Sequence, residues 1–453
     1  MRRSRRFLPV FFLLLGFLSG PAQASELSLT EAVELALQRN SRIYQSDKEL
    51  ELSRLNIIKA LGIALPKVSA RYDFSHLRYR YEQESNVTVA GQTITTPLPR
   101  SFDSNKASLN VVQPLFSGGR DWILFFGAFD TIRLNEALLE RTRQEVVFDT
   151  KQAYYQVLNL SRLVEVANQA VAQMEEHYHV ATAHFEQGMA VKTDVLSAEI
   201  TLASARQQLI KAKNSEKLAR SMLNFLIDKE LERFFELIED DSATSPLKVD
   251  SAGCVELALQ FRPEIRQMRS KLALDNKQVW LARSDYFPSM GLFYTHQLEG
   301  GLMVKDDPNY WEDTSEEESW IAGGYFELKL FNGGMTAANV REEKIKLNQS
   351  KRRFSDLMKK IRLEVLTAYS AVEENLALLD VSQKTGQQAQ ENFRITKLLY
   401  AEGLAQSSQV MDAHTLLANA QTEELQANYN YKLALSELEK AVGRELEEGE
   451  FQE

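Results

Sequence analysis

The sequence predicts a mainly α-helical fold of two tandem repeats, each carrying two strands long enough to cross an outer membrane. Three observations support this prediction: ordered matches between the two halves, alternating apolar and polar residues near prolines, and long proline-free heptad patterns. A length of 453 residues would otherwise suggest roughly two to four compact domains. Internal repetition takes precedence over that estimate because it defines the structural unit directly.

Residues 1–24 are expected to be a secretory signal peptide. Arginines precede an apolar run of about 12 residues, and Ala22, Gln23 and Ala24 form a cleavage signal of the A-x-A type. The apolar run is too short for a helix that crosses a bilayer, which needs about 20 residues. We therefore expect an exported mature chain that begins at residue 25.

Composition argues against several classes of function. The 53 lysines and arginines against 63 aspartates and glutamates give a net charge of −10, whereas a nucleic-acid partner would require a basic surface. Cys254 is the single cysteine, so the chain can form neither an internal disulfide nor a thiolate metal cluster. The sequence contains no phosphate-binding loop and no nucleophile or zinc-protease motif. We expect no cofactor, no metal and no enzymatic activity.

The two halves of the chain match each other in order. The hexamer at residues 33–38 recurs at residues 255–260, an offset of 222 positions. Beyond the strands the offset becomes 215, because the first copy carries about seven extra residues. The resulting divisions are residues 25–228 and 251–443 for the two repeats, 229–250 for a linker, and 444–453 for an acidic C-terminal tail.

Each repeat is expected to open with a helix that ends before a proline. These helices cover about residues 28–64 and 251–286, ahead of Pro66 and Pro288, because the residue before a proline is pushed out of the helical conformation. Apolar and polar residues then alternate with period two, which is typical of a strand with one wet face. The four strands are expected at residues 67–80, 105–116, 289–299 and 319–331.

The predicted strands carry aromatic residues that suit a membrane. Tyr72 and Trp320 fit positions that face lipid or a girdle at the membrane interface. Polar loops are expected between the strands of each repeat, with Pro97 in the first loop and the acidic run at residues 312–318 in the second. We expect the acidic loop to be solvated and extracellular.

Long helices are expected after each double glycine, because proline is then absent over a long stretch. A helix over about residues 121–187 would be roughly 100 Å long at 1.5 Å per residue. The chain should reverse at tip turns over residues 186–193 and 401–408. The return helices carry alanine at seven-residue spacing, which favours close antiparallel packing on the outgoing helices. These alanines are Ala198, Ala205, Ala212, Ala219, Ala413, Ala420, Ala427, Ala434 and Ala441.

The opening and return helices together match the long helix in length, so we expect them to stack end to end beside it. One chain supplies four strands of roughly 10 residues, too few to close a barrel. An open sheet edge in lipid leaves backbone groups without hydrogen bonds, so the barrel must be shared between chains. Three copies give twelve strands and a wide duct, whereas side chains would nearly fill a barrel of eight.

Several short motifs occupy the same place in both repeats. They are the double-glycine motifs at residues 113–119 and 330–334, the turn segments at 185–189 and 400–404, and the C-terminal run at 427–431. Through these motifs the chain resembles the TolC family of outer-membrane efflux proteins over nearly its whole mature length. The resemblance implies a homotrimer in which a twelve-strand barrel in outer-membrane lipid continues into a periplasmic helical barrel, with residues 229–250 in an equatorial belt.

The resemblance also implies a function and its partners. The trimer would be the exit channel of a tripartite efflux or type I secretion system, with cargo delivered by an inner-membrane pump or ABC exporter through a periplasmic adaptor. The implied adaptor-docking tips are Gly188, Met189, Gly403 and Leu404, the implied periplasmic aperture is Asp194, Tyr400, Gln409 and Asp412, and the strand-to-helix junctions are Gly118, Gly119, Gly333 and Gly334.

The implied aperture departs from the family at two positions. Gln409 stands where the family has a companion acidic residue, and Ala405 stands at its usual tip arginine. Three copies of Asp412 around a threefold axis would still concentrate negative potential in a narrow mouth and favour cations. Tyr400 and Asp194 retain the other half of the family's gate.

The histidines at residues 177, 179 and 184 are expected to lie on a solvated helix face. His177 and His184 share a face but lie two turns apart, whereas a metal-binding pair on a helix needs a spacing of four residues. Cys254 is expected to be a small packing residue.

The sequence leaves two other classes of protein as alternatives. A periplasmic adaptor-like coiled-coil protein would explain the helices and the signal peptide, but not four strands of membrane length repeated in pairs. An enzyme on a helical scaffold would need a convergent acid, base or metal cluster, which the sequence does not suggest. Drug efflux and protein secretion use the same duct, so the cargo also stays open.

Overall fold

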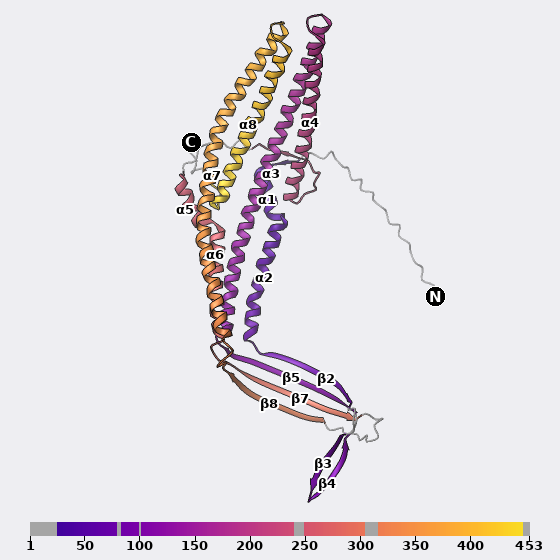
Figure 1. Ribbon diagram of the computed structural model, residues 1–453, viewed down its shortest axis with the longest axis vertical. Helices are drawn as coiled ribbons and strands as arrows, with labels where there is room; N and C mark the ends of the chain where they lie inside the picture. The colour runs from indigo at the N-terminus through magenta and orange to yellow at the C-terminus, as the bar shows by residue number, and fades with distance from the viewer. Residues whose placement is uncertain (1–24, 79–82, 99–100, 240–248, 304–315, 447–453) are drawn as a thin grey trace, which may run out of the picture.

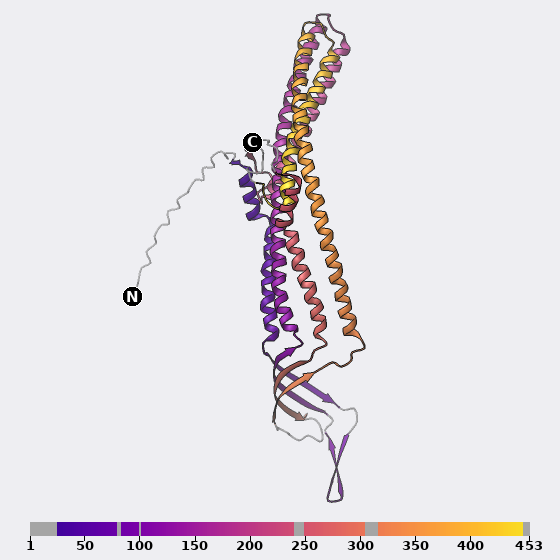
Figure 2. The ribbon, with the colours of Figure 1, turned by 90° about the vertical axis from the view of Figure 1, so that its left-hand side faces the viewer.

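The computed structural model describes residues 25–446 apart from 79–82, 99–100, 240–248 and 304–315. The molecule is an elongated rod of helices with a β-sheet projecting from one end (Figures 1 and 2). Two long helices, α3 (Arg120–Glu186) and α7 (Met335–Ala401), each contain 67 residues and are therefore about 100 Å long. Among the described residues, no helix combines the length and the apolar character needed to span a bilayer. The predicted mainly helical architecture of two repeats is confirmed.

Shorter helices stack end to end beside the long ones, as expected (Figure 1). They are α2 (Ser41–Ala64) and α4 (Lys192–Leu226) in the first repeat, and α6 (Pro263–Ser284) and α8 (Ser407–Val442) in the second. One side chain bridges each stacked pair. Asn40 Nδ2 donates to the carbonyl oxygen of Leu226 at 3.1 Å, and Arg262 Nη1 donates to that of Ala441 at 3.2 Å.

The opening helix of each repeat is broken, so the prediction of single helices was wrong. The first divides at Asn40 into α1 (Leu29–Arg39) and α2, and the Asn40 side chain caps α2 by accepting the N–H of Arg42 at 3.0 Å. The second divides at Arg262 into α5 (Ser251–Phe261) and α6. Pro263 starts α6, because a proline is tolerated at the first helical position, where its missing N–H is not needed.

The alanines at heptad spacing form the contact between each return helix and its long helix. All nine are buried, and each is at most 8% exposed. The small side chains allow α4 to approach α3, and α8 to approach α7, more closely than larger residues would. The expected close antiparallel packing is therefore confirmed.

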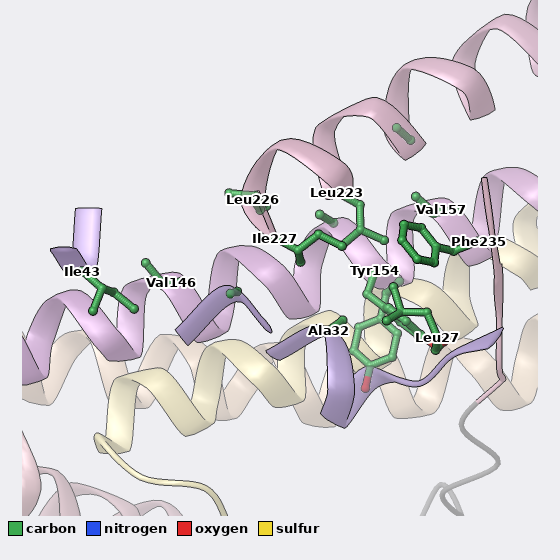
Figure 3. Packing of buried hydrophobic residues seen from close by; sticks show 14 of the residues in the cluster. Leu27, Ala32, Ile43, Val146, Tyr154, Val157, Leu223, Leu226, Ile227 and Phe235 are labelled. Carbon is green, nitrogen blue, oxygen red and sulfur yellow. The ribbon is translucent and has the colours of Figure 1, made fainter. Parts of the chain in front are cut away.

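A small core lies at the middle of the rod, where the first described residues meet the linker. β1 (Ser25–Leu27) pairs in parallel with β6 (Phe235–Leu237), a pairing that was not predicted. Tyr154 of α3 is fully buried there, and its hydroxyl lies 2.9 Å from the carbonyl oxygen of Leu27 and 2.7 Å from that of Ile238. Leu27 and Phe235 pack around Tyr154 (Figure 3). The start of the linker is thus anchored to the long helix.

The projecting sheet is antiparallel, with the strand order β2–β5–β7–β8. Its strands are β2 (Lys67–Arg78), β5 (Ser101–Ser117), β7 (Ser289–Met303) and β8 (Glu316–Glu327). The cross-strand register divides the sheet into two unlike faces. One face is mostly apolar and carries Val68, Tyr72, Phe74, Leu109, Val111, Leu292, Tyr294, Leu298, Trp320 and Phe326. The other is mostly polar and carries Lys67, Arg71, Asp73, Lys106, Asn110, Gln297, Glu299 and Glu317.

Two aromatic rings on the polar face lie over glycines of the neighbouring strand. A Cβ atom at Gly291 would lie 2.6 Å from the ring of Tyr325, and one at Gly323 would lie 2.9 Å from the ring of Phe293. A larger residue at either glycine would displace the ring, so these glycines are required by packing between β7 and β8.

The loop expected in the first repeat contains a hairpin, which the sequence analysis missed. β3 (Gln83–Val89) and β4 (Gln92–Leu98) pair in antiparallel fashion and project beyond the sheet (Figure 1). Ala90 and Gly91 both have positive φ, 54° and 82°, as a two-residue turn of type I′ requires. Pro97 lies in β4, and a two-stranded ribbon can accept it because each of its strands is an edge.

The last strand differs from its predicted range at both ends. Glu316 to Glu318, expected in the acidic loop, begin β8 because they pair with β7 from Gly300 to Leu298. The rest of that predicted loop lies outside the described residues. The strand ends at Glu327 because Glu327 pairs with Ser289, the first residue of β7. Residues 328–331, expected in the strand, therefore have no strand beside them in the chain.

Candidate functional site

Both helical hairpins end in the same tight turn, at the end of the rod opposite the sheet (Figure 1). Gly188 has φ +73° and donates its N–H to the carbonyl oxygen of Phe185 at 3.0 Å, and Met189 donates to the carbonyl five residues back at 2.8 Å. The second tip repeats both hydrogen bonds at Gly403 and Leu404, with the same lengths. Glycine is favoured here because the helix C-terminus adopts positive φ.

The tips present large apolar side chains to solvent. Met189 is 64% exposed, Val191 61% and Leu404 76%. Exposed apolar side chains gathered on one end of a molecule are typical of a surface that contacts another protein.

The predicted aperture residues have unlike environments. Asp194 is half-buried in the first turn of α4, and Asp412 is exposed on α8. Gln409 caps α8, because its Oε1 accepts the N–H of Gln406 at 2.9 Å. Gln409 therefore has a local structural role, and the side chain of Asp412 is exposed to solvent.

Tyr400 lies between the two hairpins and is only 6% exposed. Its ring centroid lies 5.1 Å from that of His177 and 5.3 Å from that of His184. Its hydroxyl is enclosed and has no hydrogen-bond partner of good geometry in the described part of the chain, although the Ser407 hydroxyl lies close by. Burial raises the pKa of Tyr400, and the Asp194 carboxylate adds to this rise. Asp194 therefore acts on Tyr400 through its charge and does not accept a hydrogen bond from the hydroxyl.

The expectation that the histidines lie on a solvated face is wrong for His177. Its side chain is buried, and Nε2 lies 3.0 Å from Oγ of Ser407 on α8. Burial lowers the pKa of His177, and His414 acts in the same direction while Asp194 opposes them. Helix α3 contacts α8 as well as α4, so its buried surface is wider than one heptad seam. His179, in contrast, is exposed.

Further contacts join the hairpins beside His177. Lys397 Nζ of α7 lies 2.6 Å from Glu176 Oε2 of α3, and Thr201 Oγ1 of α4 lies 3.2 Å from Met411 Sδ of α8. Together these contacts form what we call the tip seam, the junction between the α3–α4 hairpin and the α7–α8 hairpin near their tips. Its residues are Glu176, His177, Val180, His184, Thr201, Lys397, Tyr400, Ser407, Met411 and His414.

The junction glycines turn the chain from sheet to helix. Gly118 and Gly119 have φ of +66° and +81°, and Gly333 and Gly334 have +67° and +83°. Each pair directly precedes a long helix, and few residues other than glycine adopt such angles without strain. Arg120 strengthens the first junction through an ion pair of 3.1 Å with Asp285 at the end of α6.

Charged residues also line a cavity of about 540 Å³ between α3, α6, α7 and α8. Arg262 at its wall pairs with Glu264 at 2.8 Å and with Glu364 at 2.7 Å. The Arg262–Glu364 pair joins the start of α6 to α7, so the cavity lies where helices pack together. Among the described residues no cluster of three histidine, cysteine or acidic side chains could hold a metal ion.

Comparison with known families and proteins identifies close architectural relatives. A family model described as outer membrane efflux protein matches residues 32–227 and 254–444. The alkaline protease secretion protein AprF of Pseudomonas aeruginosa is 26% identical over 449 residues, covering 97% of this chain and 88% of its own. The outer membrane protein TolC of Escherichia coli is 21% identical over 452 residues, covering 97% of this chain and 86% of its own.

A solved structure has the same fold. The CmeC outer membrane channel of Campylobacter jejuni superposes with a TM-score of 0.75 at 19% identity, covering 94% of this chain and 86% of its own. The superposition includes both the helical rod and the sheet, since it extends over nearly the whole chain.

Proposed function

The chain belongs to the outer membrane efflux protein family, and we propose that three copies of it form a passive exit channel across the outer membrane. Cargo would be delivered by an inner-membrane pump or ABC exporter through a periplasmic adaptor. The single observation that carries this proposal is a four-stranded sheet with one apolar face, one polar face and two open edges.

The sheet supports a barrel that several chains share. Within the described sheet, β2 and β8 each pair with one strand. An open edge in lipid would leave backbone groups unpaired at a cost of several kcal/mol each. Pairing β8 of one copy with β2 of the next removes this cost, and the apolar face then contacts lipid while the polar face lines a lumen.

The sheet-to-helix junctions support ring closure. Within one chain, the first junction packs against the end of α6, because a Cβ at Gly118 would lie 2.3 Å from the carbonyl oxygen of Ser284. The repeat offset predicts that the second junction packs in the same way against the end of α2 in a neighbouring copy. Leu330 and Phe331 at that second junction are 89% and 87% exposed in the single chain, as an unfilled contact would be. Three copies give twelve strands and a wide duct.

Aromatic residues near the sheet support contact with outer-membrane lipid. Tyr72 and Trp320 on the apolar face are 67% and 69% exposed, and Trp122, next to the sheet, is 66% exposed. Trp122 stacks on Phe126 with ring centroids 6.3 Å apart. Aromatic side chains of this kind collect at the boundary between lipid and water.

The apolar tips support docking of a periplasmic adaptor. We propose that Met189 and Leu404, each following a tip glycine, insert into the adaptor, while Asp194, Tyr400, Gln409 and Asp412 surround the aperture. AprF is a secretion protein and the Pseudomonas putida relative TtgC is a probable efflux pump outer membrane protein, so relatives of both kinds occur. The channel needs no catalytic group, because the pump would supply the energy and select the cargo.

Fractionation followed by native mass spectrometry tests this proposal. We expect the protein in the outer-membrane fraction and a detergent-extracted particle with three times the mass of the mature chain. A monomer in the soluble periplasmic fraction would contradict the channel and favour the adaptor-like alternative.

A further inference from the structure

We infer that the tip seam is an acid-sensitive latch, in which protonation of the buried imidazole of His177 separates the two hairpins and opens the periplasmic end of the channel. This inference rests on the proposed channel function, because the latch would regulate the opening of the proposed aperture. It begins from a geometric fact, namely that a titratable side chain of one hairpin is enclosed by the other.

The enclosure of His177 involves both helices of the second hairpin. Its ring lies 5.1 Å from the ring of Tyr400 on α7, and its Nε2 lies 3.0 Å from Ser407 Oγ on α8. His414 of α8 is also buried and lies against Phe393, with ring centroids 5.7 Å apart. Two buried imidazoles therefore belong to opposite sides of one contact.

The charged groups around His177 do little to stabilise an imidazolium there. Asp194 on α4 is the carboxylate that favours the charged form, whereas burial and His414 on α8 disfavour it. Tyr400 on α7 is uncharged at neutral pH, since burial raises its pKa further. Glu176 on α3 is already paired with Lys397 on α7 at 2.6 Å. Protonation would therefore place a poorly solvated charge in the seam.

The direction of the pH effect follows from linkage. Burial lowers the pKa of His177 in the closed seam. In separated hairpins its imidazole would be hydrated and would titrate near the ordinary value of about 6.5. The separated state then binds more protons than the closed state as pH falls through that range, so acid favours separation. At pH values well above about 6.5 both states are neutral and the closed seam keeps its full stability.

Separation at the seam would leave each hairpin intact. Most contacts inside the hairpins involve the buried alanines of α4 and α8, which do not titrate, and His414 adds one contact with Phe393 inside the second hairpin. Other contacts across the seam include the Glu176–Lys397 pair, the Thr201–Met411 contact, the His184–Tyr400 ring contact and the packing of Val180. Carboxylates and lysines ordinarily titrate outside the range from about pH 5.5 to 7.5, which leaves histidine as the group that responds.

Planar-bilayer recordings of the full-length protein at pH 7.5 and 5.5 test the latch. We expect the mean conductance of the wild type to rise by at least about threefold on acidification, because one histidine can shift the equilibrium by up to about tenfold per pH unit. His177→Gln keeps a side chain that can hydrogen-bond Ser407 but does not titrate, and should stay at low conductance. His179→Gln is the matched control, since His179 is an exposed histidine on the same helix, and should keep the wild-type response.

A reversible crosslink supplies a second measurement. Thr201→Cys combined with Met411→Cys places one thiol on each of two facing helices, at positions whose side chains now touch through Oγ1 and Sδ at 3.2 Å. Cys254 is buried far along the chain in α5. The oxidised double variant should keep a low conductance at both pH values. Reduction with dithiothreitol should restore the rise at pH 5.5.

The outcomes separate the latch from the channel itself. Equal wild-type conductance at both pH values overturns the latch and leaves the channel standing. An acid response that persists in the His177→Gln, His414→Gln double variant, or in the oxidised crosslinked protein, also overturns the latch. Absence of current steps at either pH from a folded trimer contradicts the proposed channel, and the latch with it.

Discussion

The two strand-to-helix junctions have nearly the same backbone but very different surroundings. Gly118 and Gly333 have φ of +66° and +67°, and each is followed by a second glycine at the start of a long helix. A Cβ at Gly118 would meet the backbone of Ser284, whereas open space surrounds one at Gly333 in the described part of the chain. The repeated motif sets the turn in both places, and the open space at the second is where the proposed trimer would place a neighbouring copy.

Side chains at the junctions show how the repeats keep a structural role while changing residues. Ser117 hydrogen-bonds Asp121 across the first turn of α3. At the equivalent positions Asn332 Nδ2 donates to Thr336 Oγ1 at 2.6 Å across the first turn of α7. The backbone turn therefore brings these two positions together in both repeats, and different pairs of polar residues can form the hydrogen bond between them.

Gly118→Ala is expected to have the largest effect. Positive φ costs a non-glycine residue roughly 1–2 kcal/mol, and the collision with Ser284 adds to that cost. Gly333→Ala, the matched variant, should show the conformational cost without the collision when the chain is monomeric. Urea unfolding of the refolded monomer, followed through the helical circular dichroism signal, compares the two variants. Equal losses of unfolding free energy would show that the contact between Gly118 and Ser284 does not distinguish the two junctions.

Phe331→Asp is expected to prevent trimer formation while leaving the helices folded. Phe331 is 87% exposed in the chain, so the monomer loses little, but a fully buried phenylalanine contributes about 1.5–3 kcal/mol to each interface. Native mass spectrometry should show monomers with wild-type circular dichroism. Arg352→Ala is the control, because its ion pair with Asp356 lies on the surface and such pairs contribute little. A stable Phe331→Asp trimer would show that the second junction is not an interface.

Tyr154→Phe extends the comparison of repeats to the middle of the rod. The hydroxyl lies within hydrogen-bond distance of two carbonyl oxygens, and leaving them without a donor should cost about 1–3 kcal/mol. Tyr369, the equivalent residue of the second repeat, is only half-buried, and Tyr369→Phe should change unfolding free energy by less than about 0.5 kcal/mol. Equal effects in thermal unfolding would show that β1 and β6 do not depend on this hydroxyl.

Asp412→Ala should have the smallest effect on stability and act on conductance. The side chain is exposed, so removing it should leave folding unchanged while reducing block by divalent and trivalent cations. Asp380→Ala, which removes an exposed carboxylate paired with Lys384 on α7, should leave block unchanged. Equal block by cations in the wild type and in Asp412→Ala would contradict the proposal that three Asp412 side chains form a cation-binding ring.

Local periodicity is the reason that most of the architecture could be predicted from the sequence. The nine heptad alanines and the alternation around Val68 and Leu109 each reflect one element packing against its neighbour. The tip glycines could be placed because they follow long periodic helices and take up the positive φ that ends such helices. Because the two halves repeat, each element assigned in one half could also be assigned in the other.

What the sequence missed depends on contacts between distant segments. β1 is three residues long and pairs with a strand more than 200 positions away, so it has no periodicity to detect. His177 follows Met174 by three positions and precedes Ala181 by four, and both of these residues are buried. That spacing is typical of a buried residue, a signal that the expectation of a solvated face overlooked, and the partner Ser407 lies in the other repeat. The β3–β4 hairpin had a local signal, the alternation of Val87, Val89 and Ile94 around Gly91, which its prolines obscured.

Single-channel current from the purified, detergent-extracted protein in a planar bilayer at neutral pH tests the central claim most directly. A trimer that spans the membrane and is closed at its periplasmic end should give stable steps of small conductance. Absence of steps from a well-folded oligomer would contradict the claim that this chain forms a channel.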